Sequence, residues 1–301
     1  MQPVRAPQPL ATLSEWLRCP NCFADLHPAA PLVLSCPHGH RFDVNRRGYV
    51  SLIIGSRRLI GDSPAMLDAR DTFLGRGWYA DLRDALSALV AAEHASRVID
   101  IGCGTGYYLR GVLAAVGAAT AETGGTPRPE PRALAIDLSA PAVARTVRAA
   151  TEGPDAATAG LVADVWSPLP VRDAAAEVVI NVFAPRNPAE FHRVVAPGGL
   201  LAVVVPHPTH LQELRADGLA LDVHENKMAD LVAGLDGLFE LERAQDLSTE
   251  LSLSPADVTA LIGMGPSAHH QRDAEPGSDS PREARPVTVA FRLLAFRRIQ
   301  S

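Results

Sequence analysis

The stretch Asp100-Ile101-Gly102-Cys103-Gly104-Thr105-Gly106 decides the fold of this chain. It ends an apolar run, residues 97–101, that predicts a strand, and it opens an apolar segment, residues 106–116, that predicts a helix. Glycines at alternate positions let the backbone turn tightly and pass close to a ligand, while the helix behind them presents free N–H groups. The sequence therefore predicts a strand–turn–helix unit that binds a nucleotide-like molecule.

Strands and helices alternate along the chain on both sides of this glycine-rich turn. The expected strands are apolar without strict alternation, which indicates burial on both faces, as in a parallel sheet covered by helices. These strands span residues 97–101, 133–137, 161–164, 177–183 and 200–205, and the expected helices span residues 64–74, 79–91, 106–116, 140–150, 188–194, 225–235 and 255–262. Two stretches, residues 117–132 and 269–286, are rich in small residues or proline and predict a disordered insertion and a mobile segment.

The glycine pattern GxGxG, preceded by an acidic residue at a strand end, differs from the dinucleotide pattern GxGxxG. It resembles motif I of the class I S-adenosylmethionine-dependent methyltransferases. The resemblance implies an α/β, Rossmann-like fold that ends in a pair of strands, one of them antiparallel, for which residues 238–247 and 287–296 are available. Cys103, inside the turn, is then a small free thiol.

Polar residues follow the ends of the next three strands in order. Asp137 ends the second strand, where a carboxylate is placed to bond ribose hydroxyls. Asp164 ends the third strand, where this fold reads the adenine amine, and residues 181–186 end the fourth, where the methyl group meets its acceptor. Four suitable strand ends in the right order favour a methyltransferase, and a scaffold that has lost the activity is the alternative.

The N-terminal part carries a metal-binding pattern. Cys19 and Cys22 stand three residues apart and, after thirteen residues, Cys36 is followed by His38 and His40. Three cysteines and one histidine complete a closed tetrahedral zinc shell, which is typical of a structural site. His40 is the preferred fourth ligand because its spacing lets the chain loop around the metal, and His38 is its rival. A redox pair is the alternative to zinc. Roughly 25 residues cannot build a core, so zinc would supply the folding energy there.

The charge of the chain is unevenly distributed. Residues 1–58 hold seven arginines against three acidic residues, which gives this segment a net charge of +4. Because the net charge of the whole chain is −6, residues 59–301 carry −10. Arginines alternate with Phe42 and Tyr49 after the cysteines, a composition that suits phosphate contact and base stacking. We expect RNA contacts from Arg46, Arg47, Arg57 and Arg58, and an ordinary solvated surface is the alternative.

Length and composition bound the class of protein. The chain has 301 residues, 47% hydrophobic and 21% charged, which excludes wholesale disorder. No apolar run reaches the roughly 20 residues of a membrane helix, and the N-terminus carries no secretory signal, so we expect a cytoplasmic protein. We divide the chain into a zinc-binding, RNA-contacting module (1–58), a helical linker (59–96) and a methyltransferase domain (97–301).

A Cys3His pattern directly before motif I resembles one family, the bacterial 23S rRNA (guanine-N1)-methyltransferases, including the tylosin-resistance type. The stretches that carry the resemblance are residues 19–22, 36–52, 61–66, 69–70, 73–74, 79, 100–108, 184–185 and 206–211. The resemblance implies that Tyr79 and His210 line the cofactor pocket. It also implies a homodimer whose zinc modules and catalytic domains form a cleft for a 23S rRNA hairpin. Residues 264–269 favour the branch that methylates guanine 748 over the one that methylates guanine 745.

The expected cofactors are S-adenosylmethionine and Zn²⁺. Zinc is assigned to Cys19, Cys22, Cys36 and His40, and S-adenosylmethionine is assigned to Tyr79, Asp100, Gly102, Gly104, Thr105, Gly106, Asp137, Asp164, Asn181 and His210. No catalytic base is assigned, since Asp222, His224 and Glu225 are polar residues that more often lie on a solvated surface. Two other functions fit less well: a small-molecule methyltransferase with a purely structural zinc module, and a non-catalytic rRNA-binding protein.

Overall fold

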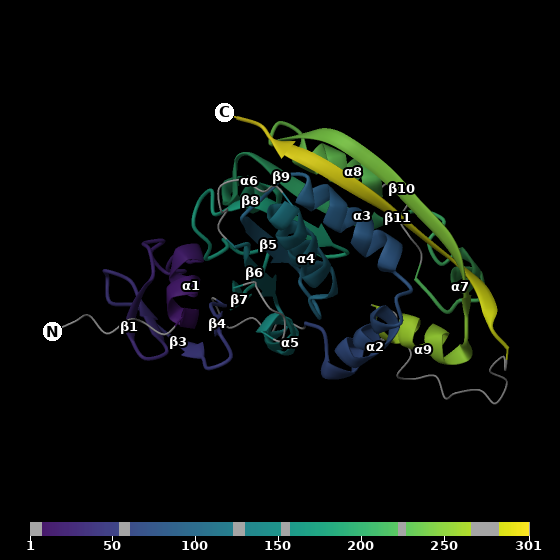
Figure 1. Cartoon of the computed structure of the whole chain (residues 1–301), viewed down its shortest axis with the longest axis horizontal. Coiled ribbons are helices and arrows are strands. Elements are labelled where there is room, and N and C mark those ends of the chain that lie inside the picture. The colour runs from purple at the N-terminus through teal and green to yellow at the C-terminus, as the bar shows by residue number, and fades with distance from the viewer. Residues whose placement is uncertain are drawn as a thin grey trace.

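The computed structural model describes residues 8–53, 61–122, 130–151, 157–221, 227–265 and 283–300. None of the helices within these ranges is long and apolar enough to cross a membrane. In Figure 1 the N-terminal module lies at one end of the molecule, and the two longest strands, β10 and β11, run along the other side. The C-terminus lies beside the end of β11 that is farthest from α9.

One sheet of eleven strands runs through the whole protein, in the order β1-β2-β3-β4-β7-β6-β5-β8-β9-β11-β10. Its strands are β1 (His27–Ala30), β2 (Val33–Ser35), β3 (Arg41–Asn45), β4 (Tyr49–Ser51), β5 (Arg97–Ile101), β6 (Arg132–Asp137), β7 (Ala157–Val162), β8 (Ala176–Val182), β9 (Val195–Pro206), β10 (Phe239–Leu253) and β11 (Arg285–Arg298). The five strands from β7 to β9 are parallel, as the apolar runs predicted. Strand β11 lies antiparallel between β9 and β10, which confirms the expected final pair.

Helices cover both faces of this sheet. They are α1 (Gln8–Trp16), α2 (Pro64–Gly75), α3 (Ala80–Ala91), α4 (Tyr107–Glu122), α5 (Ala140–Thr151), α6 (Pro188–Val194), α7 (Gln212–Ala216), α8 (Lys227–Leu235) and α9 (Pro255–Gly263). Alternate strand residues enter two separate cores: Val98 packs with α3 and α4, while Ile99 and Ile101 pack with α1 and α6. Burial on both faces explains why the strand sequences do not alternate. Figure 1 shows α3 and α4 together over one face.

The N-terminal module is continuous with the large sheet. Strand β4 pairs in parallel with β7, and Leu17 forms a β-bridge with Val171. The side chains of Leu13, Trp16 and Leu17 are fully buried, in the same core as Ile99 and Ile101 of β5. Apolar packing on the sheet therefore adds to the folding energy that zinc was expected to supply in this part of the chain.

Several boundaries differ from the predicted ones, among them the end of α4 and both ends of β7. Helix α4 continues to Glu122, so the first part of the stretch expected to be a disordered insertion is helical, since its alanines are strong helix formers. Residues 123–129 lie outside the described residues, as does most of the segment 269–286. Strand β7 ends at Val162, so Asp164 lies in the following turn instead of at the strand end.

Candidate functional site

The glycine-rich turn connects β5 to α4 at the carboxyl edge of the sheet. Gly102, Gly104 and Gly106 have φ angles of +87°, +52° and +75°, which other residues rarely adopt. The amides of Gly102 and Cys103 both donate to the carbonyl of Ile136, at 2.8 and 3.0 Å, and so fix the turn against β6. The sequence therefore requires glycine here for the backbone conformation as well as for space beside a ligand.

Asp137 holds the other side of the turn. Its carboxylate accepts hydrogen bonds from the amides of Gly104 (3.0 Å) and Ser139 (2.8 Å). Burial raises the pKa of Asp137, while these two amides oppose the rise. The residue predicted to bond ribose hydroxyls thus also stiffens the glycine-rich turn.

Asp100 lies directly before the turn and is 3% exposed. Burial, followed by the nearby Asp137 carboxylate, raises its pKa to about 8. No basic side chain pairs with Asp100 among the residues that the structure describes. A positively charged ligand bound here would favour the ionised forms of Asp100 and of the partly buried Asp137.

The turn after β8 is in contact with the glycine-rich turn. A Cβ atom placed on Gly102 would lie 2.2 Å from the Cβ of Ala184. Asn181 is fully buried, and its Nδ2 donates to the carbonyls of Ile101 (3.0 Å) and Pro185 (3.1 Å). Phe183, which lies between Asn181 and Pro185 in the chain, has a φ of +54°, an uncommon backbone conformation for a residue with a bulky side chain. Asn181 therefore joins the ends of β5 and β8 and fixes the strained turn.

Aromatic rings form a continuous cluster beside these turns. The ring centroids of Tyr79 and His210 are 6.3 Å apart, and each packs on Phe291, at 4.7 and 4.8 Å. Phe183 packs on Phe291 at 5.4 Å and on Tyr108 at 6.4 Å. The structure thus brings together the two residues that the family resemblance assigned to the cofactor pocket.

His210 is a neutral imidazole in this cluster. Its Nδ1 lies 3.1 Å from the amide of Ala290 and accepts its hydrogen bond, which leaves the proton on Nε2. Burial, followed by the charge of Arg215, lowers the pKa of His210 to about 3. It therefore offers a ring face and one N–H donor, and no charge, at physiological pH.

Unsatisfied polar atoms surround the glycine-rich turn. Thr105 Oγ1, the hydroxyl of Tyr108 and Asn181 Oδ1 are buried and have no hydrogen-bond partner among the described residues. Such groups are costly unless a ligand or water satisfies them. The chemistry of these groups therefore fits a polar ligand bound beside the three glycines.

Asp164 shapes the turn that follows β7. Its carboxylate accepts hydrogen bonds from the amide of Trp166 (3.0 Å) and from the hydroxyl of Ser167 (3.1 Å). Asn187 fastens this turn to the β8 turn, because its Nδ2 donates to the carbonyl of Val165 at 3.0 Å. Asp164 therefore determines where the exposed Trp166 ring projects.

The four predicted zinc ligands converge. The Sγ atoms of Cys19, Cys22 and Cys36 and a ring nitrogen of His40 all lie within 4.8 Å of one another. His40 Nδ1 is 3.5 Å from Cys19 Sγ and 3.3 Å from Cys36 Sγ. These separations match the edges of a tetrahedron with metal–ligand distances of about 2.0–2.3 Å. The residues present therefore fit Zn²⁺.

Among the cysteines in the described part of the chain, the rival ligand His38 contacts Cys22, with 3.2 Å between His38 Nδ1 and the sulfur. It lies outside the group of four, so the geometry favours His40. Burial acts to raise the pKa of Cys36, but hydrogen bonds, chiefly from the backbone and side chain of His40, lower it to about 6. A low pKa favours the thiolate, which is the form that binds a metal.

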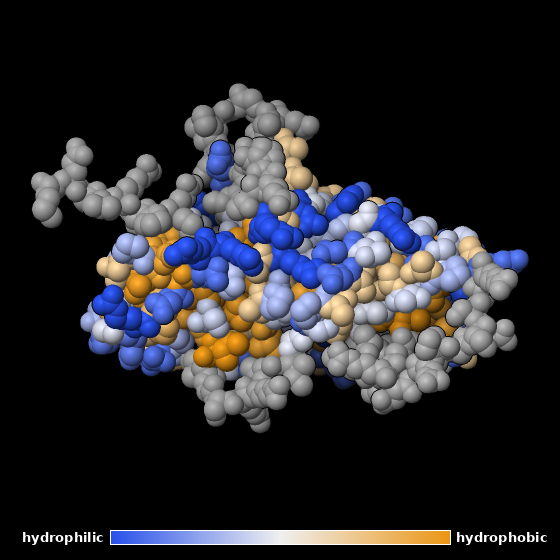
Figure 2. Space-filling model, turned by 90° about the horizontal axis from the view of Figure 1, so that it is seen from below, coloured by the Kyte–Doolittle hydropathy of each residue, from blue (hydrophilic) through white to orange (hydrophobic). Residues whose placement is uncertain are grey.

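The structure describes two of the four arginines that were predicted to contact RNA. Arg46 and Arg47 are exposed in the turn between β3 and β4, whereas Arg57 and Arg58 lie outside the described residues. Arg47 and Tyr49 line a groove of about 700 Å³ whose other wall includes α5. The residues of this groove are Arg47, Tyr49, Asp68, Asp71, Ala140, Pro141, Ala144, Arg145 and Arg148. Figure 2 shows hydrophilic side chains across the middle of the lower face, with hydrophobic patches to the left and right of them.

Sequence reasoning missed several residues of the site. Arg70 reaches over the glycine-rich turn from α2, and its guanidinium lies 2.8 Å from the position of a Cβ on Gly104. Trp166 and Arg186 line an open pocket beside the β8 turn. Arg186 ends the segment 181–186 that was expected at the acceptor, and Arg70 stands in a stretch that carries the family resemblance, but neither side chain was assigned a role. Trp166 belongs to no pattern, although it stands only two residues after Asp164. The polar residues Asp222, His224 and Glu225 lie outside the described residues.

Comparisons with known proteins agree with both parts of the molecule. A family model described as RlmA, N-terminal, a zinc ribbon, matches residues 17–54. The 23S rRNA (guanine(748)-N(1))-methyltransferase of Streptomyces fradiae is 40% identical over 261 residues, which cover 85% of this chain and 86% of that protein. A protein of Micromonospora griseorubida named as a 23S rRNA (guanine-N(1)-)-methyltransferase is 39% identical over 305 residues, which cover 94% and 97%.

Solved structures resemble the chain more distantly. The YcgJ protein from Bacillus subtilis has a TM-score of 0.46 at 13% identity, over 72% of this chain and 98% of that one. The N-methyltransferase NodS from Bradyrhizobium japonicum has a TM-score of 0.41 at 11% identity, over 74% and 89%. The family assignment rests on the sequence relatives.

The sheet order, the glycine-rich turn and the Cys3His cluster are those of a class I S-adenosylmethionine-dependent methyltransferase with an N-terminal zinc-binding module. The two sequence relatives align with most of the chain at 39% and 40% identity. The protein belongs to the family of 23S rRNA (guanine-N1)-methyltransferases.

Proposed function

We propose that this protein transfers a methyl group from S-adenosylmethionine to N1 of guanine 748 in a hairpin of 23S rRNA. The observation that carries the proposal is the 40% identity to the Streptomyces fradiae enzyme named for that nucleotide. Guanine 745 is the neighbouring alternative. A methyl group at guanine 748 would protect ribosomes against tylosin-type macrolides, which makes antibiotic resistance the physiological role that we infer.

The three glycines, Thr105 and Asp137 are the residues that we expect to hold the cofactor over the β5–α4 turn, with Tyr79 and His210 at its edge. S-adenosylmethionine supplies a methyl carbon bonded to a positively charged sulfur. Asp137 favours that charge, the charge would in turn favour loss of the proton from Asp100, and the uncharged ring of His210 does not oppose it. We expect Asp164 to lie beside the adenine of the cofactor, farther along the molecule than the ribose.

The chain has to orient the acceptor and the cofactor in line. Guanine N1 carries a proton in the neutral base, so that proton has to leave as the new N–C bond forms. Contact between Gly102 and Ala184 sets the distance between the two turns, and Asn181 ties their strands together. Such positioning lowers the barrier by making the reaction effectively unimolecular.

The N-terminal module is proposed to capture the RNA. Arg46 and Arg47 project from a zinc-stabilised ribbon, and Arg145 and Arg148 lie on the α5 side of the groove that Arg47 lines. Asp68 and Asp71 neutralise Arg145, which leaves the module as the more basic wall. We infer a homodimer, in which two modules and two catalytic domains grip one hairpin. Because ribosomal RNA is the substrate, we place the protein in the cytoplasm.

Primer extension tests the proposed function. Reverse transcriptase copies 23S rRNA from cells that express this chain and from cells that carry the empty vector. A methyl group on guanine N1 blocks the Watson–Crick edge, so we expect a stop next to position 748 only in the expressing cells. A stop next to position 745 would move the target by three nucleotides. Identical patterns in both samples, with the protein present, would refute the proposal.

A further inference from the structure

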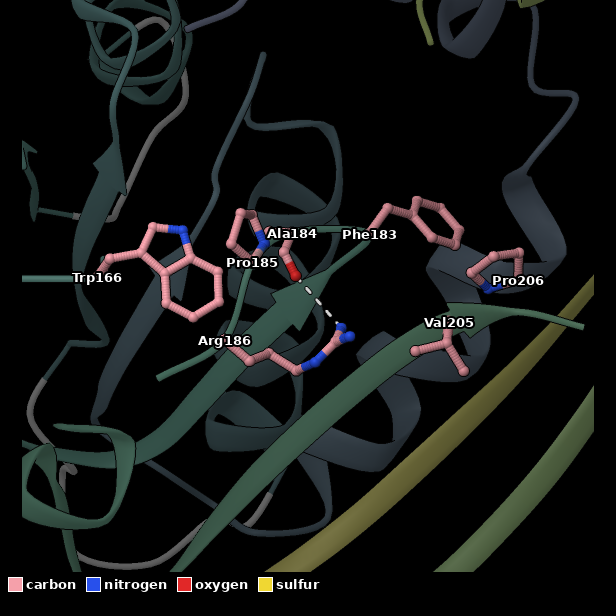
Figure 3. A pocket seen from close by; sticks show the side chains of 7 residues that line it. All are labelled: Trp166, Phe183, Ala184, Pro185, Arg186, Val205 and Pro206. Atoms are coloured by element: carbon pink, nitrogen blue, oxygen red, sulfur yellow. Dashed lines mark hydrogen bonds between the residues drawn. The ribbon is translucent and has the colours of Figure 1, made fainter. Parts of the chain in front are cut away.

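An open pocket of about 390 Å³ lies at the carboxyl ends of β8 and β9. Its lining is Trp166, Phe183, Ala184, Pro185, Arg186, Val205 and Pro206, shown in Figure 3. The volume is within the range of small-molecule sites, roughly 300–1,000 Å³. We propose that this pocket receives the target guanine, with Trp166 and Phe183 as stacking walls and Arg186 as the group that recognises guanine. This inference rests on the proposed function and adds the residues that select the base.

The two aromatic walls are unusually exposed. Trp166 is 68% and Phe183 is 43% exposed, although large apolar side chains normally lie inside. In Figure 3 they stand on opposite sides of the segment from Ala184 to Arg186. Exposed aromatic faces at a binding site stack on unpaired bases, as nucleic-acid-binding proteins use them. The two rings thus provide surfaces for a base taken out of its stack.

The structure maintains Phe183 in a strained conformation. Its φ of +54° costs free energy, and such outliers concentrate at functional sites. Asn181 holds the turn by donating to Pro185, and the amide of Phe183 donates to Val204 at 3.1 Å. These contacts keep the Phe183 ring at the pocket while one side of it packs on Phe291.

Arg186 is a cation without an acidic partner among the described residues. Its guanidinium is half-buried and donates one hydrogen bond, at 3.2 Å, to the carbonyl of Ala184. Burial removes water from this guanidinium and lowers the pKa of Arg186. A desolvated guanidinium with free N–H groups favours a ligand that presents two acceptors.

Guanine presents such a pair. O6 and N7 lie on one edge and accept a bidentate arginine, whereas adenine has an amino donor in place of O6. Contact on the O6–N7 edge leaves N1 free. Ala184 lines the pocket and also touches Gly102 of the glycine-rich turn, so a base held by Arg186 directs N1 toward the methyl donor.

The test uses purified full-length protein and a synthetic hairpin with guanine or 7-deazaguanine at position 748. The analogue lacks the N7 acceptor but keeps N1 and O6. We expect the wild type to lose about 10-fold or more in kcat/KM on the analogue. Arg186→Gln should be slower on guanine by about 10- to 100-fold and should treat the two hairpins alike. Arg243→Gln, an exposed arginine on β10, is the matched control and should behave like the wild type.

A second measurement tests the stacking walls. Of the three tryptophans Trp166 is the most exposed, Trp78 is half-buried and Trp16 is fully buried. Bound hairpin should therefore quench fluorescence in the wild type and much less in Trp166→Phe. Trp166→Ala should raise KM for the hairpin about 10- to 100-fold and leave the affinity for S-adenosylmethionine unchanged. Equal rates of wild type on both hairpins, or unchanged KM in Trp166→Ala, would overturn the inference. A wild type inactive on every hairpin would instead refute the proposed function.

Discussion

The substitution Gly102→Ala adds a single methyl group, which should push the glycine-rich turn away from the turn after β8. In Gly102→Ala the new Cβ meets the Cβ of Ala184 at 2.2 Å, while ordinary contacts are 3.4–4 Å. One of the two turns must therefore move by more than 1 Å. Because the acceptor has to lie in line with the methyl group, the movement should reduce activity more than it reduces stability.

The expected loss of stability has two parts. Alanine at a φ of +87° costs about 1–2 kcal/mol. Overpacking against Ala184 costs about 1–3 kcal/mol more. The free energy of unfolding should therefore fall by about 2–5 kcal/mol, which lowers the melting temperature by roughly 4–20 °C in a protein of this size. Urea unfolding followed by circular dichroism measures the change, and calorimetry measures the affinity for S-adenosylmethionine.

Two further variants separate the causes. Ala184→Gly removes the colliding atom, so the double variant should recover about 1–3 kcal/mol and leave only the cost of the backbone conformation. Gly117→Ala is the control within α4: nothing lies within 4 Å of its Cβ, and it should gain up to about 1 kcal/mol. If Gly102→Ala unfolds like the wild type, or if Ala184→Gly gives no rescue, the two turns do not touch as described.

Three other predictions concern the metal, the RNA and the pH. Elemental analysis should find about one zinc per chain, and Cys36→Ser should lose it and expose the amides of β1–β3 to hydrogen exchange while the buried α1 stays protected; full zinc content in Cys36→Ser would contradict the ligand set. Replacing Arg46 and Arg47 by Ala should flatten the log–log salt dependence of hairpin binding by about one to two units, and an unaltered slope would exclude phosphate contacts. The pKa of Asp100 is about 8 in the native state and lower in the unfolded state, so the native state holds the proton more tightly. The free energy of unfolding should therefore fall as the pH rises from about 4 to 8, and Asp100→Asn should remove that part of the fall. If the wild type and Asp100→Asn have identical pH profiles of stability, the carboxyl group lies in water.

Features coded by neighbouring residues could be predicted from the sequence. Ser63 caps α2 as expected, because its side chain accepts from the amide of Met66 and Pro64 fills the first helical position. The glycine-rich turn and the parallel strands followed from local patterns in the same way. Spacing predicted that Cys19, Cys22 and Cys36 converge with a histidine, and the structure decided between His38 and His40.

Features that depend on distant contacts could not be predicted. The bridge between Leu17 and Val171 joins residues that no local pattern relates, so the shared core of the N-terminal module was not visible in the sequence. The pocket beside the β8 turn also depends on contacts between residues that are far apart in the sequence. Trp166 and Arg186 come from different loops, which long-range hydrogen bonds such as that from Asn187 Nδ2 to the carbonyl of Val165 hold together. The division of the chain at residues 58 and 96 stays a prediction.

The most direct test of the account is the identity of the methylated nucleotide. The purified protein is incubated with a 23S rRNA hairpin transcript and isotopically labelled S-adenosylmethionine, and the RNA is then digested to nucleosides. The account predicts that all label is in 1-methylguanosine, at about one methyl group per transcript, and that a transcript with adenine at position 748 takes up none. Label in another nucleoside, or an unmethylated transcript despite bound cofactor, would contradict it.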